Sequence, residues 1–351
     1  MMGNNGVRVL AAMSGGVDSS VAVWLLKEQG FDCVGATMRL LGGAPQDEED
    51  ARQAAARLGI PHHVFDLTAS FEEKVVRRFV DAYERGDTPN PCVDCNRFLK
   101  FGLLYEKARE LDCRYIATGH YAQITDCGGN GFHLSKAADL SRDQSYVLYP
   151  IPRERLAYTR FPLGGLTKAQ VRAIAEREGF PNARKRDSQD ICFIPDGDYL
   201  AFLERYTGRS YPAGDILDLG GKVVGRHRGA AGLTIGQRRG VGVSSPGRIY
   251  VCAKCMEANT VTVGPEEALY SRGCMAADWN WLTEPPSGPF RALVKTRYRQ
   301  TEQPAAVFPE AGRVRLEFGH PQRAVTPGQA AVVYDGSGRV LGGGTIAEVI
   351  Q

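Results

Sequence analysis

Residues 7–20 read Val-Arg-Val-Leu-Ala-Ala-Met-Ser-Gly-Gly-Val-Asp-Ser-Ser, and this stretch decides the fold of the first half of the chain. The apolar run Val7–Met13 predicts a strand that enters a turn of glycines and serines, and a helical pattern follows over Ser19–Gln29. Glycines let successive backbone N–H groups face one anion, and a helix N-terminus adds partial positive charge. The stretch lacks both the Walker pattern and the Gly-x-Gly-x-x-Gly spacing. We therefore predict a phosphate-binding loop here, against the alternative of a glycine-rich turn without a ligand.

Strand and helix patterns alternate beyond this junction through the first half of the chain. Further strands are expected at Phe31–Met38, His63–Leu67 and Tyr115–Thr118, and helices at Glu48–Leu58, Phe71–Arg85, Arg97–Leu111, Lys168–Glu178 and Tyr199–Tyr206. Such alternation predicts an α/β fold in which helices cover both faces of a parallel sheet. Ligands of this fold class bind beyond the carboxyl ends of the strands.

The pattern changes near residue 208 into short β-like runs separated by glycine and proline. Strands are expected at Arg248–Val251, Thr260–Val263, Arg291–Tyr298, Arg313–Phe318 and Ala330–Tyr334. This pattern predicts barrels or sandwiches, with residues 281–289 as a linker between two β modules. We predict a phosphate-loop domain over residues 1–207, a central β-rich domain over 208–280 and a C-terminal β-barrel over 281–351.

Composition narrows the class of protein without naming a function. Of the 351 residues, 43% are hydrophobic and 24% are charged, which is typical of a globular protein. The net charge of +3 does not by itself indicate nucleic-acid binding. We find neither a signal peptide nor a run of about 18 apolar residues, so we expect a cytoplasmic protein that does not enter a membrane.

The nine cysteines favour reactive, metal-binding or buried thiols over a disulfide framework. Two of them, Cys92 and Cys95, lie in a loop of prolines and asparagines before a predicted helix, where the helix dipole is expected to lower the pKa of Cys95. A third, Cys192, lies in a motif further along the chain. The alternatives are a zinc half-site and inert buried thiols, and the role of the second Cys-x-x-Cys pair, Cys252 and Cys255, stays open.

The phosphate loop resembles that of the ATP pyrophosphatase superfamily, and the remaining motifs resemble the bacterial tRNA-specific 2-thiouridylases. The shared motifs run in order along nearly the whole chain: Thr88-Pro89-Asn90-Pro91, Cys95-Asn96, Gly119-His120-Tyr121-Ala122, Asp143-Gln144-Ser145-Tyr146, Ser188-Gln189-Asp190-Ile191-Cys192-Phe193, Thr234-Ile235-Gly236-Gln237-Arg238-Arg239-Gly240, Arg297-Tyr298-Arg299-Gln300, Pro327-Gly328-Gln329 and Gly342-Gly343-Gly344.

This resemblance implies a role for each matching position. Cys95 matches the catalytic nucleophile and Cys192 matches the persulfide carrier. The positions that match ATP contacts are Ala12, Met13, Ser14, Gly15, Gly16, Val17, Asp18, Ser19, Met38 and Gly119. Those that match contacts to the target base are Asn90, Pro91 and Cys92, and those that match other tRNA contacts are His120, Arg142, Asp143, Gln144, Arg297, Tyr298 and Gln329.

The implied reaction is that of an ATP-dependent tRNA-uridine 2-sulfurtransferase. ATP, with Mg²⁺, would adenylate the C2 oxygen of the wobble uridine (U34) because that oxygen is otherwise a poor leaving group. Sulfur from a cysteine persulfide would then replace it, giving 2-thiouridine, AMP and pyrophosphate, with Cys95 either releasing sulfide or forming a disulfide. The expected partners are the tRNAs for Lys, Glu and Gln, and a cysteine desulfurase or sulfur-relay protein.

One departure from the family concerns Cys92, because many members carry aspartate at this position. Cys92, Cys95 and Cys192 together would provide three ligands for a [4Fe-4S] cluster with one open iron. The persulfide route is the default, and the cluster is the alternative.

Basic residues in the C-terminal region predict a tRNA-binding face. Arg291, Lys295, Arg297 and Arg299 share parity along one expected strand and should emerge on one side of it. The alternative is an ordinary solvated basic surface. For the whole protein, two rival functions are a metabolic ligase with the same phosphate loop and a nucleotide-binding tRNA chaperone, neither of which requires Cys95 and Cys192.

Overall fold

The computed structural model describes residues 4–185, 191–245 and 247–351. The first 207 residues contain a five-stranded sheet in the order β3-β2-β1-β4-β7, in which every neighbouring pair is parallel. Its strands are β1 (Arg8–Ala12), β2 (Asp32–Arg39), β3 (His62–Asp66), β4 (Tyr115–Ala117) and β7 (Thr159–Arg160). The predicted parallel α/β fold is confirmed.

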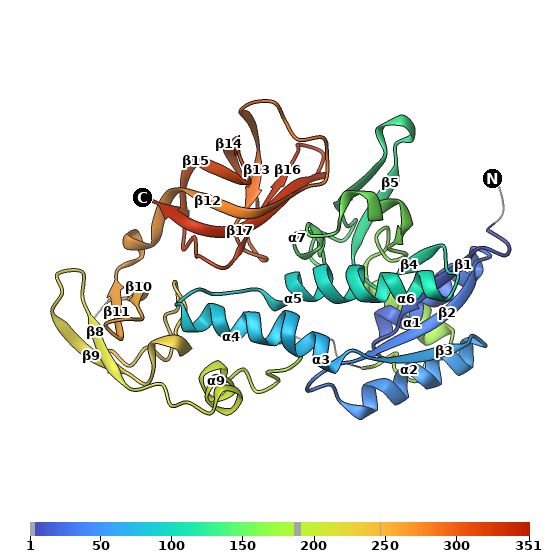
Figure 1. The fold of residues 1–351 in the computed structure, drawn as a ribbon, viewed down its shortest axis with the longest axis horizontal. Coiled ribbons are helices and arrows are strands. Elements are labelled where there is room, and N and C mark those ends of the chain that lie inside the picture. Colours follow the sequence, from blue (N-terminus) through green and yellow to red (C-terminus); the bar gives the residue numbers. More distant parts are fainter. Residues whose placement is uncertain (1–3, 186–190, 246) are drawn as a thin grey trace.

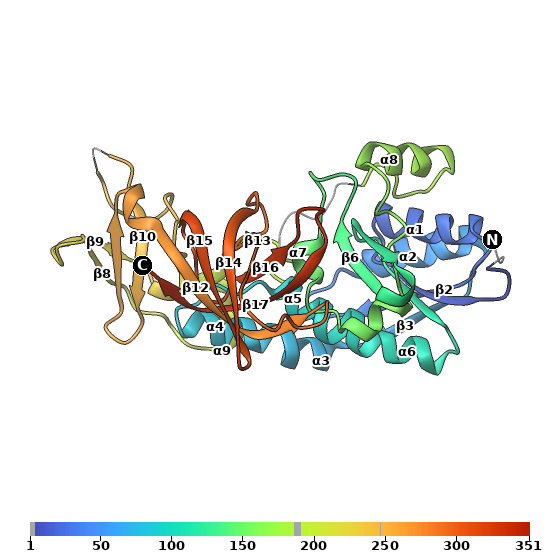
Figure 2. The ribbon, with the colours of Figure 1, turned by 90° about the horizontal axis from the view of Figure 1, so that it is seen from above.

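Helices cover both faces of this sheet (Figures 1 and 2). On one face, a core packs β1 against α1 (Val17–Glu28), α2 (Pro45–Leu58) and α8 (Lys168–Arg177). On the other face, β1 and β2 pack against a continuous helical segment made of α5 (Pro91–Asp94), the π-helix η2 (Cys95–Leu103) and α6 (Leu104–Glu110). The sequence fits these bounds, because Pro45 opens α2 and Gly59 ends it in a left-handed conformation.

The remaining elements of this half are a second helical segment, three further helices and a β-hairpin. A second helical segment consists of α3 (Thr68–Phe71), the π-helix η1 (Glu72–Val76) and α4 (Arg77–Glu84). Later in the chain come the short helix α7 (Ser145–Leu148), the 3₁₀-helix η4 (Arg153–Tyr158) and α9 (Tyr199–Thr207). We did not predict the antiparallel hairpin of β5 (Ala122–Asp126) and β6 (Phe132–Lys136), joined through the 3₁₀-helix η3 (Gly128–Asn130).

The second half is β-structure, as predicted, in two units. A four-stranded sheet has the order β10-β11-β8-β9, with β8 (Gly214–Leu217), β9 (Val223–His227), β10 (Tyr250–Cys255) and β11 (Thr260–Gly264) and the 3₁₀-helices η5 (Ala230–Gly232) and η6 (Glu266–Leu269) beside it. A closed antiparallel barrel consists of β12 (Tyr270–Trp281), β13 (Phe290–Lys295), β14 (Gln303–Glu310), β15 (Arg313–Arg323), β16 (Ala330–Tyr334) and β17 (Val340–Ile350).

Two details of the predicted second half are wrong. The barrel begins with β12 at Tyr270, so the predicted boundary at residue 281 and the linker 281–289 fall inside the barrel, between β12 and β13. The expected strand Arg291–Tyr298 ends at Lys295, because the chain turns there and the Gln300 side chain accepts hydrogen bonds from Thr296.

The barrel packs tightly on the α/β domain. Buried barrel side chains, Val332 and Tyr334 among them, belong to the same apolar core as β1 and α7. The backbone N–H of Thr88 donates to the carbonyl of Pro327 (2.9 Å), and the Gln329 amide donates to the carbonyl of Thr88 (2.6 Å). The loop before the cysteines is therefore fixed by the barrel.

Gly328 makes a close backbone contact at this junction, and we expect Gly328→Ala to destabilise the protein by at least about 1–2 kcal/mol. Its φ is +87°, and an added Cβ would lie 2.9 Å from the backbone nitrogen of Thr88. Urea unfolding would measure the loss. Gly288→Ala is the control, because a Cβ there meets no atom within 4 Å and its φ is not positive; equal stability of the two variants would contradict this interpretation of the junction.

Candidate active site

The loop between β1 and α1 has the geometry of an anion-binding site. Gly15 has a φ of +70°, and a Cβ there would lie 2.3 Å from the carbonyl oxygen of Asp47, so only glycine fits. The Ser19 hydroxyl closes the loop by accepting from the Ser14 backbone N–H (3.2 Å) and donating to the carbonyl of Gly16 (2.9 Å). The N-cap residue of α1 is Gly16, which has no side chain to cap the helix, so the first N–H groups of α1 can face a phosphate.

The sheet brings the other expected ATP positions to this loop. The strand order reverses between β1 and β4, and ligands bind at such a switch point. Met38 lies near the end of β2, and Gly119 follows β4. A Cβ at Gly119 would lie 2.9 Å from the backbone nitrogen of Ser19, so this glycine packs directly on the first turn of α1.

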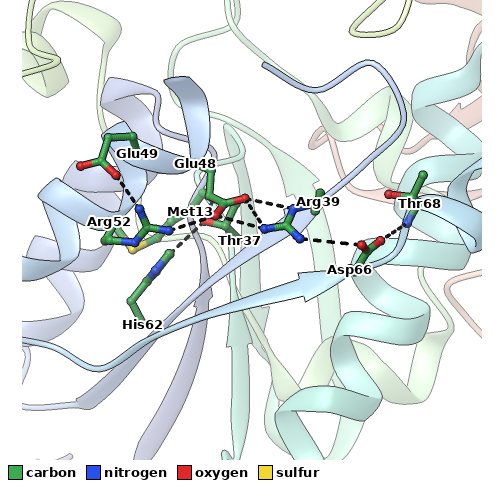
Figure 3. Close-up of polar contacts among 9 residues, drawn as sticks. All are labelled: Met13, Thr37, Arg39, Glu48, Glu49, Arg52, His62, Asp66 and Thr68. Carbon is green, nitrogen blue, oxygen red and sulfur yellow. Dashed lines mark hydrogen bonds and ion pairs between the residues drawn. The ribbon is translucent and has the colours of Figure 1, made fainter. Parts of the chain in front are cut away.

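A polar network fixes the sheet edge beside the loop (Figure 3). The Thr37 hydroxyl donates to the carbonyl of Met13 (2.9 Å), which leaves His62 Nε2 to donate to Thr37 (2.9 Å). Burial lowers the pKa of His62, consistent with a neutral ring. Arg39 joins Glu48 of α2 at 3.0 Å and Asp66 of β3 at 3.8 Å, so α2 is held against the strand ends.

Two lysines and an asparagine surround the loop, and the sequence reasoning missed all three. Both oxygens of Asp18 accept from Lys168 Nζ at 2.8 Å, and the Tyr121 hydroxyl donates to Asp18 at 2.9 Å. Lys185 Nζ donates to Asp47 (2.7 Å) and Asp50 (2.6 Å). The Asn182 amide donates to the carbonyl of Gly15 (2.9 Å).

The Asn182 side chain also offers evidence about what the loop would bind. Its oxygen is buried and has no hydrogen-bond partner among the described residues. An amide oxygen is a ligand type that Mg²⁺ accepts. The loop and the Asn182 oxygen therefore fit a phosphate that carries Mg²⁺. The carboxylates of Asp18, Asp47 and Asp50 are paired with lysines in this structure.

The thiols lie on the helical segment that begins with α5. Asn90 caps this helix, accepting from the backbone N–H of Cys92 (3.1 Å), and Pro91 occupies its first turn. Cys95 therefore lies one turn inside the helix rather than at its start, and the expected lowering of its pKa is wrong. Burial raises the pKa of Cys95, and the Lys100 charge only partly opposes this.

Cys192 faces the same region from a different part of the chain. Its neighbour Phe193 is buried against Phe71, Phe79 and Phe202, with ring centroids 5.2–5.7 Å apart, while the Cys192 side chain itself is exposed. Although the Cys192 side chain reaches solvent, the protein packed around it reduces the hydration of the thiolate and raises the pKa of Cys192 to about 12, and the charges of Cys95 and Cys92 add to this effect. Three thiols thus lie within electrostatic reach of one another. Ser188, Gln189 and Asp190 of the same motif lie outside the described residues.

The three thiols are all free, and they do not form a metal site in this arrangement. Among the described residues, no three side chains of His, Cys, Asp or Glu are grouped closely enough to hold a metal ion.

Comparisons with known proteins agree with this combination of loop and thiols. Residues 7–196 match a family model described as a tRNA methyl transferase HUP domain, residues 200–265 a tRNA methyl transferase PRC-barrel domain and residues 271–346 an aminomethyltransferase beta-barrel domain. The tRNA-specific 2-thiouridylase MnmA of Symbiobacterium thermophilum is 45% identical, covering 98% of this chain and 93% of the relative. The chain belongs to the tRNA-specific 2-thiouridylase family.

Further relatives carry the same name. The tRNA-specific 2-thiouridylase MnmA 1 of Caldanaerobacter subterraneus subsp. tengcongensis is 44% identical over 98% of this chain and 99% of its own length. A solved 4-thiouridine synthetase in complex with RNA and ATP covers 54% of this chain and 45% of its own, at 20% identity and a TM-score of 0.39, a likeness too low to bear on function. The phosphate loop and thiols accord with the thiolation in the relatives' names rather than with the methyl transfer that the family descriptions mention.

Several residues that match tRNA contacts of the 2-thiouridylase family have their polar groups engaged within the protein. Asp143 is buried and accepts from Ala137 and Ser145. The others engaged in this way are Gln144, which accepts from the Tyr121 backbone, His120, Gln329 and Arg297. Their positions thus also have internal roles that the motif comparison did not reveal.

The predicted one-faced row of basic residues is not present. Lys295 is buried at the end of β13, and Arg297 turns inward to the carbonyls of Ala324 and Ile235 (both 2.9 Å). Arg299 is exposed, and so is Arg291. The expected alternation of side chains along one strand does not reach Arg297 and Arg299, because β13 ends at Lys295.

Tyr298 is the residue by which the barrel approaches the thiols of this 2-thiouridylase. It is partly exposed, its ring lies 6.0 Å from that of Tyr146, and the charge of Cys92 contributes to the raised pKa of its hydroxyl, after burial and Asp143. An aromatic ring beside Cys92 suits the stacking of a base that has been splayed out of an RNA loop.

Proposed function

We propose that this protein adenylates the C2 oxygen of the wobble uridine (U34) of tRNA with ATP and replaces that oxygen with sulfur from a cysteine persulfide. The observation that carries the proposal is that the phosphate loop and the three thiols are connected through neighbouring residues. Gly119 contacts the phosphate loop, and the next residue, His120, contacts Lys100, whose charge acts on Cys92, Cys95 and Cys192.

Adenylation occurs at the phosphate loop. The uridine O2 attacks the α-phosphate of ATP, N3 of the uracil loses its proton to water, and pyrophosphate leaves with the electron pair of the broken P–O bond; the proton returns to N3 when 2-thiouridine forms. The N–H groups of α1 and Lys168 hold the phosphates in place. Asn182 would offer an oxygen ligand to Mg²⁺, which when bound with ATP would neutralise negative charge on the pyrophosphate.

Sulfur transfer uses the thiols. The terminal sulfur of the Cys192 persulfide attacks C2, and AMP leaves with the electron pair of the C2–O bond. The Cys95 thiolate then attacks the Cys192 sulfur, which frees 2-thiouridine and forms a Cys95–Cys192 disulfide. An external dithiol reduces this disulfide before the next cycle. The exposure of Cys192 suits loading by a persulfide donor such as a cysteine desulfurase or sulfur-relay protein.

The alternative source of sulfur is a [4Fe-4S] cluster on Cys92, Cys95 and Cys192. Iron analysis of anaerobically reconstituted protein decides between the two. Active protein without iron would exclude the cluster, whereas thiolation that requires iron would exclude the persulfide route.

The proposed substrates are the tRNAs for Lys, Glu and Gln, bound in the cytoplasm. We propose that the α/β domain performs the chemistry and that the barrel, from residue 270 onward, presents Tyr298 and Arg299 to the tRNA. No helix of the described residues is long and apolar enough to cross a membrane.

Mass spectrometry of tRNA nucleosides tests the proposed function directly. Incubation of the protein with unmodified tRNA, ATP, Mg²⁺ and a persulfide donor should give 2-thiouridine, together with AMP and pyrophosphate that appear only when tRNA is present. AMP formed equally without tRNA would favour a metabolic ligase, and the absence of any 2-thiouridine would contradict the proposal.

Arg299 should contact the tRNA backbone, since it is exposed beside Tyr298. We expect Arg299→Gln to reduce the magnitude of the log–log salt slope of tRNA binding by roughly 0.7–0.9. Filter binding at several salt concentrations measures this slope. Arg109→Gln on the exposed side of α6 is the control, and an unchanged slope for Arg299→Gln would remove Arg299 from the interface. Arg297→Gln should instead lower stability, because it breaks inward hydrogen bonds.

A further inference from the structure

The π-helix η2 determines which side chains accompany the thiols. In a π-helix each N–H bonds the carbonyl five residues earlier, as Leu104 N–H does to Leu99 at the end of η2. Residues five apart therefore stack one turn above each other. An α-helix, with 3.6 residues per turn, would turn Lys100 well away from Cys95. The π-helix instead places Lys100 on the same side of the helix as Cys95.

A buried imidazole holds Lys100 in place. Lys100 Nζ lies 3.3 Å from His120 Nε2, and His120 Nδ1 lies 2.6 Å from the Thr118 hydroxyl. Because an ammonium group only donates, Nε2 accepts, and the ring proton lies on Nδ1 and faces Thr118. Burial, with the Lys100 charge, lowers the pKa of His120 well below its usual value, which keeps the ring neutral.

The Lys100 charge acts on the three thiols. On the thiol side, the Lys100 charge favours the ionised form of Cys92, Cys95 and Cys192, whereas the thiols disfavour one another. The nearby carboxylate, Asp94, is paired with Arg78 at 3.1 Å.

On the nucleotide side, His120 and Gly119 connect Lys100 to the phosphate loop. His120 directly follows Gly119, which packs on Ser19 in the first turn of α1. The pair Lys100–His120 therefore lies between the thiols and the phosphate loop, where the reacting C2 atom of an adenylated uridine would have to be placed.

We propose that Lys100 is a catalytic residue of the sulfur-transfer step and that His120 is its positioning residue. The proposal rests on the proposed function. As the persulfide sulfur forms its bond to C2 and AMP leaves with the electrons of the C2–O bond, negative charge moves from sulfur to the phosphate oxygen. An ammonium group fixed between the two stabilises that charge in the transition state. In adenylation, negative charge develops on the departing pyrophosphate at the phosphate loop, where the N–H groups of α1 lie, so that step does not need Lys100.

The test separates the two steps in a single turnover. Wild-type protein, Lys100→Met and Lys100→Arg are loaded with inorganic polysulfide, and intact-protein mass spectrometry confirms equal loading. They then react with tRNA and ATP while pyrophosphate and 2-thiouridine are measured. Lys100→Met should release pyrophosphate within about twofold of wild type and form 2-thiouridine about 100-fold more slowly. Lys100→Arg should recover much of that loss because it keeps the charge.

Lys107→Met is the matched control, because Lys107 lies on α6 and pairs with Glu110 at the surface. It should leave both rates unchanged. Equal slowing of both products in Lys100→Met, or no recovery in Lys100→Arg, would overturn the catalytic assignment and indicate a structural role. Failure of the wild-type protein to release pyrophosphate with tRNA would instead contradict the proposed function.

Discussion

Cys192→Ser is expected to slow the formation of 2-thiouridine by roughly 1,000-fold or more while tRNA-dependent pyrophosphate release continues. A serine hydroxyl cannot carry a second sulfur atom, so the step after adenylation has no nucleophile. The structure supports this separation, because Cys192 lies beside the buried Phe193, which makes three aromatic contacts with Phe71, Phe79 and Phe202. Single-turnover assays of both products measure the effect.

Cys255→Ser is the matched control for this variant. Cys255 is also exposed, but it lies on β10 of the four-stranded sheet. It should thiolate tRNA at the wild-type rate. Cys95→Ser should also stop the release of 2-thiouridine, because Cys95 frees the product in the proposed mechanism, but the protein should still accept one sulfur on Cys192. Near-normal thiolation by Cys192→Ser would show that sulfur reaches the uridine without a persulfide on this residue.

The fold was predictable where local pattern alone determines structure. The apolar runs at β1, β2 and β4 are buried on both sides of the sheet, so their composition reports strand and burial together. The hairpin β5–β6 was missed although Gly128, Gly129 and Gly131 mark its turn, because its strands are short and only partly buried.

The site was predictable only in part, because its partners come from distant segments. The phosphate loop is a local motif, but Lys168 reaches Asp18 across 150 positions in the sequence. The parity argument for Arg297 failed for a related reason: where β13 ends depends on how the barrel closes. Similarly, the burial that raises the pKa of Cys95 arises from packing of separate elements, so the helix-end argument could not account for it.

Asp18→Ala is expected to reduce tRNA-dependent pyrophosphate formation by about 100-fold. Its carboxylate receives Lys168 through both oxygens and the Tyr121 hydroxyl through one, so it fixes a cation beside the phosphate loop. Without Asp18, the ammonium group can leave the position from which it would hold the phosphates. Initial-rate measurement of pyrophosphate with saturating tRNA tests this expectation.

A loss of activity in Asp18→Ala has a second explanation, since removing the carboxylate leaves the largely buried Lys168 ammonium, only 9% exposed, without this partner. The double variant Asp18→Ala/Lys168→Met distinguishes the two explanations. If destabilisation is the cause, removing the ammonium restores both the unfolding midpoint and the rate. If Asp18 acts by placing Lys168 at the phosphates, the double variant regains stability but stays as slow as Asp18→Ala, because the two residues act as a unit and their effects do not add. Recovery of the rate in the double variant would therefore remove Asp18 and Lys168 from the adenylation machinery.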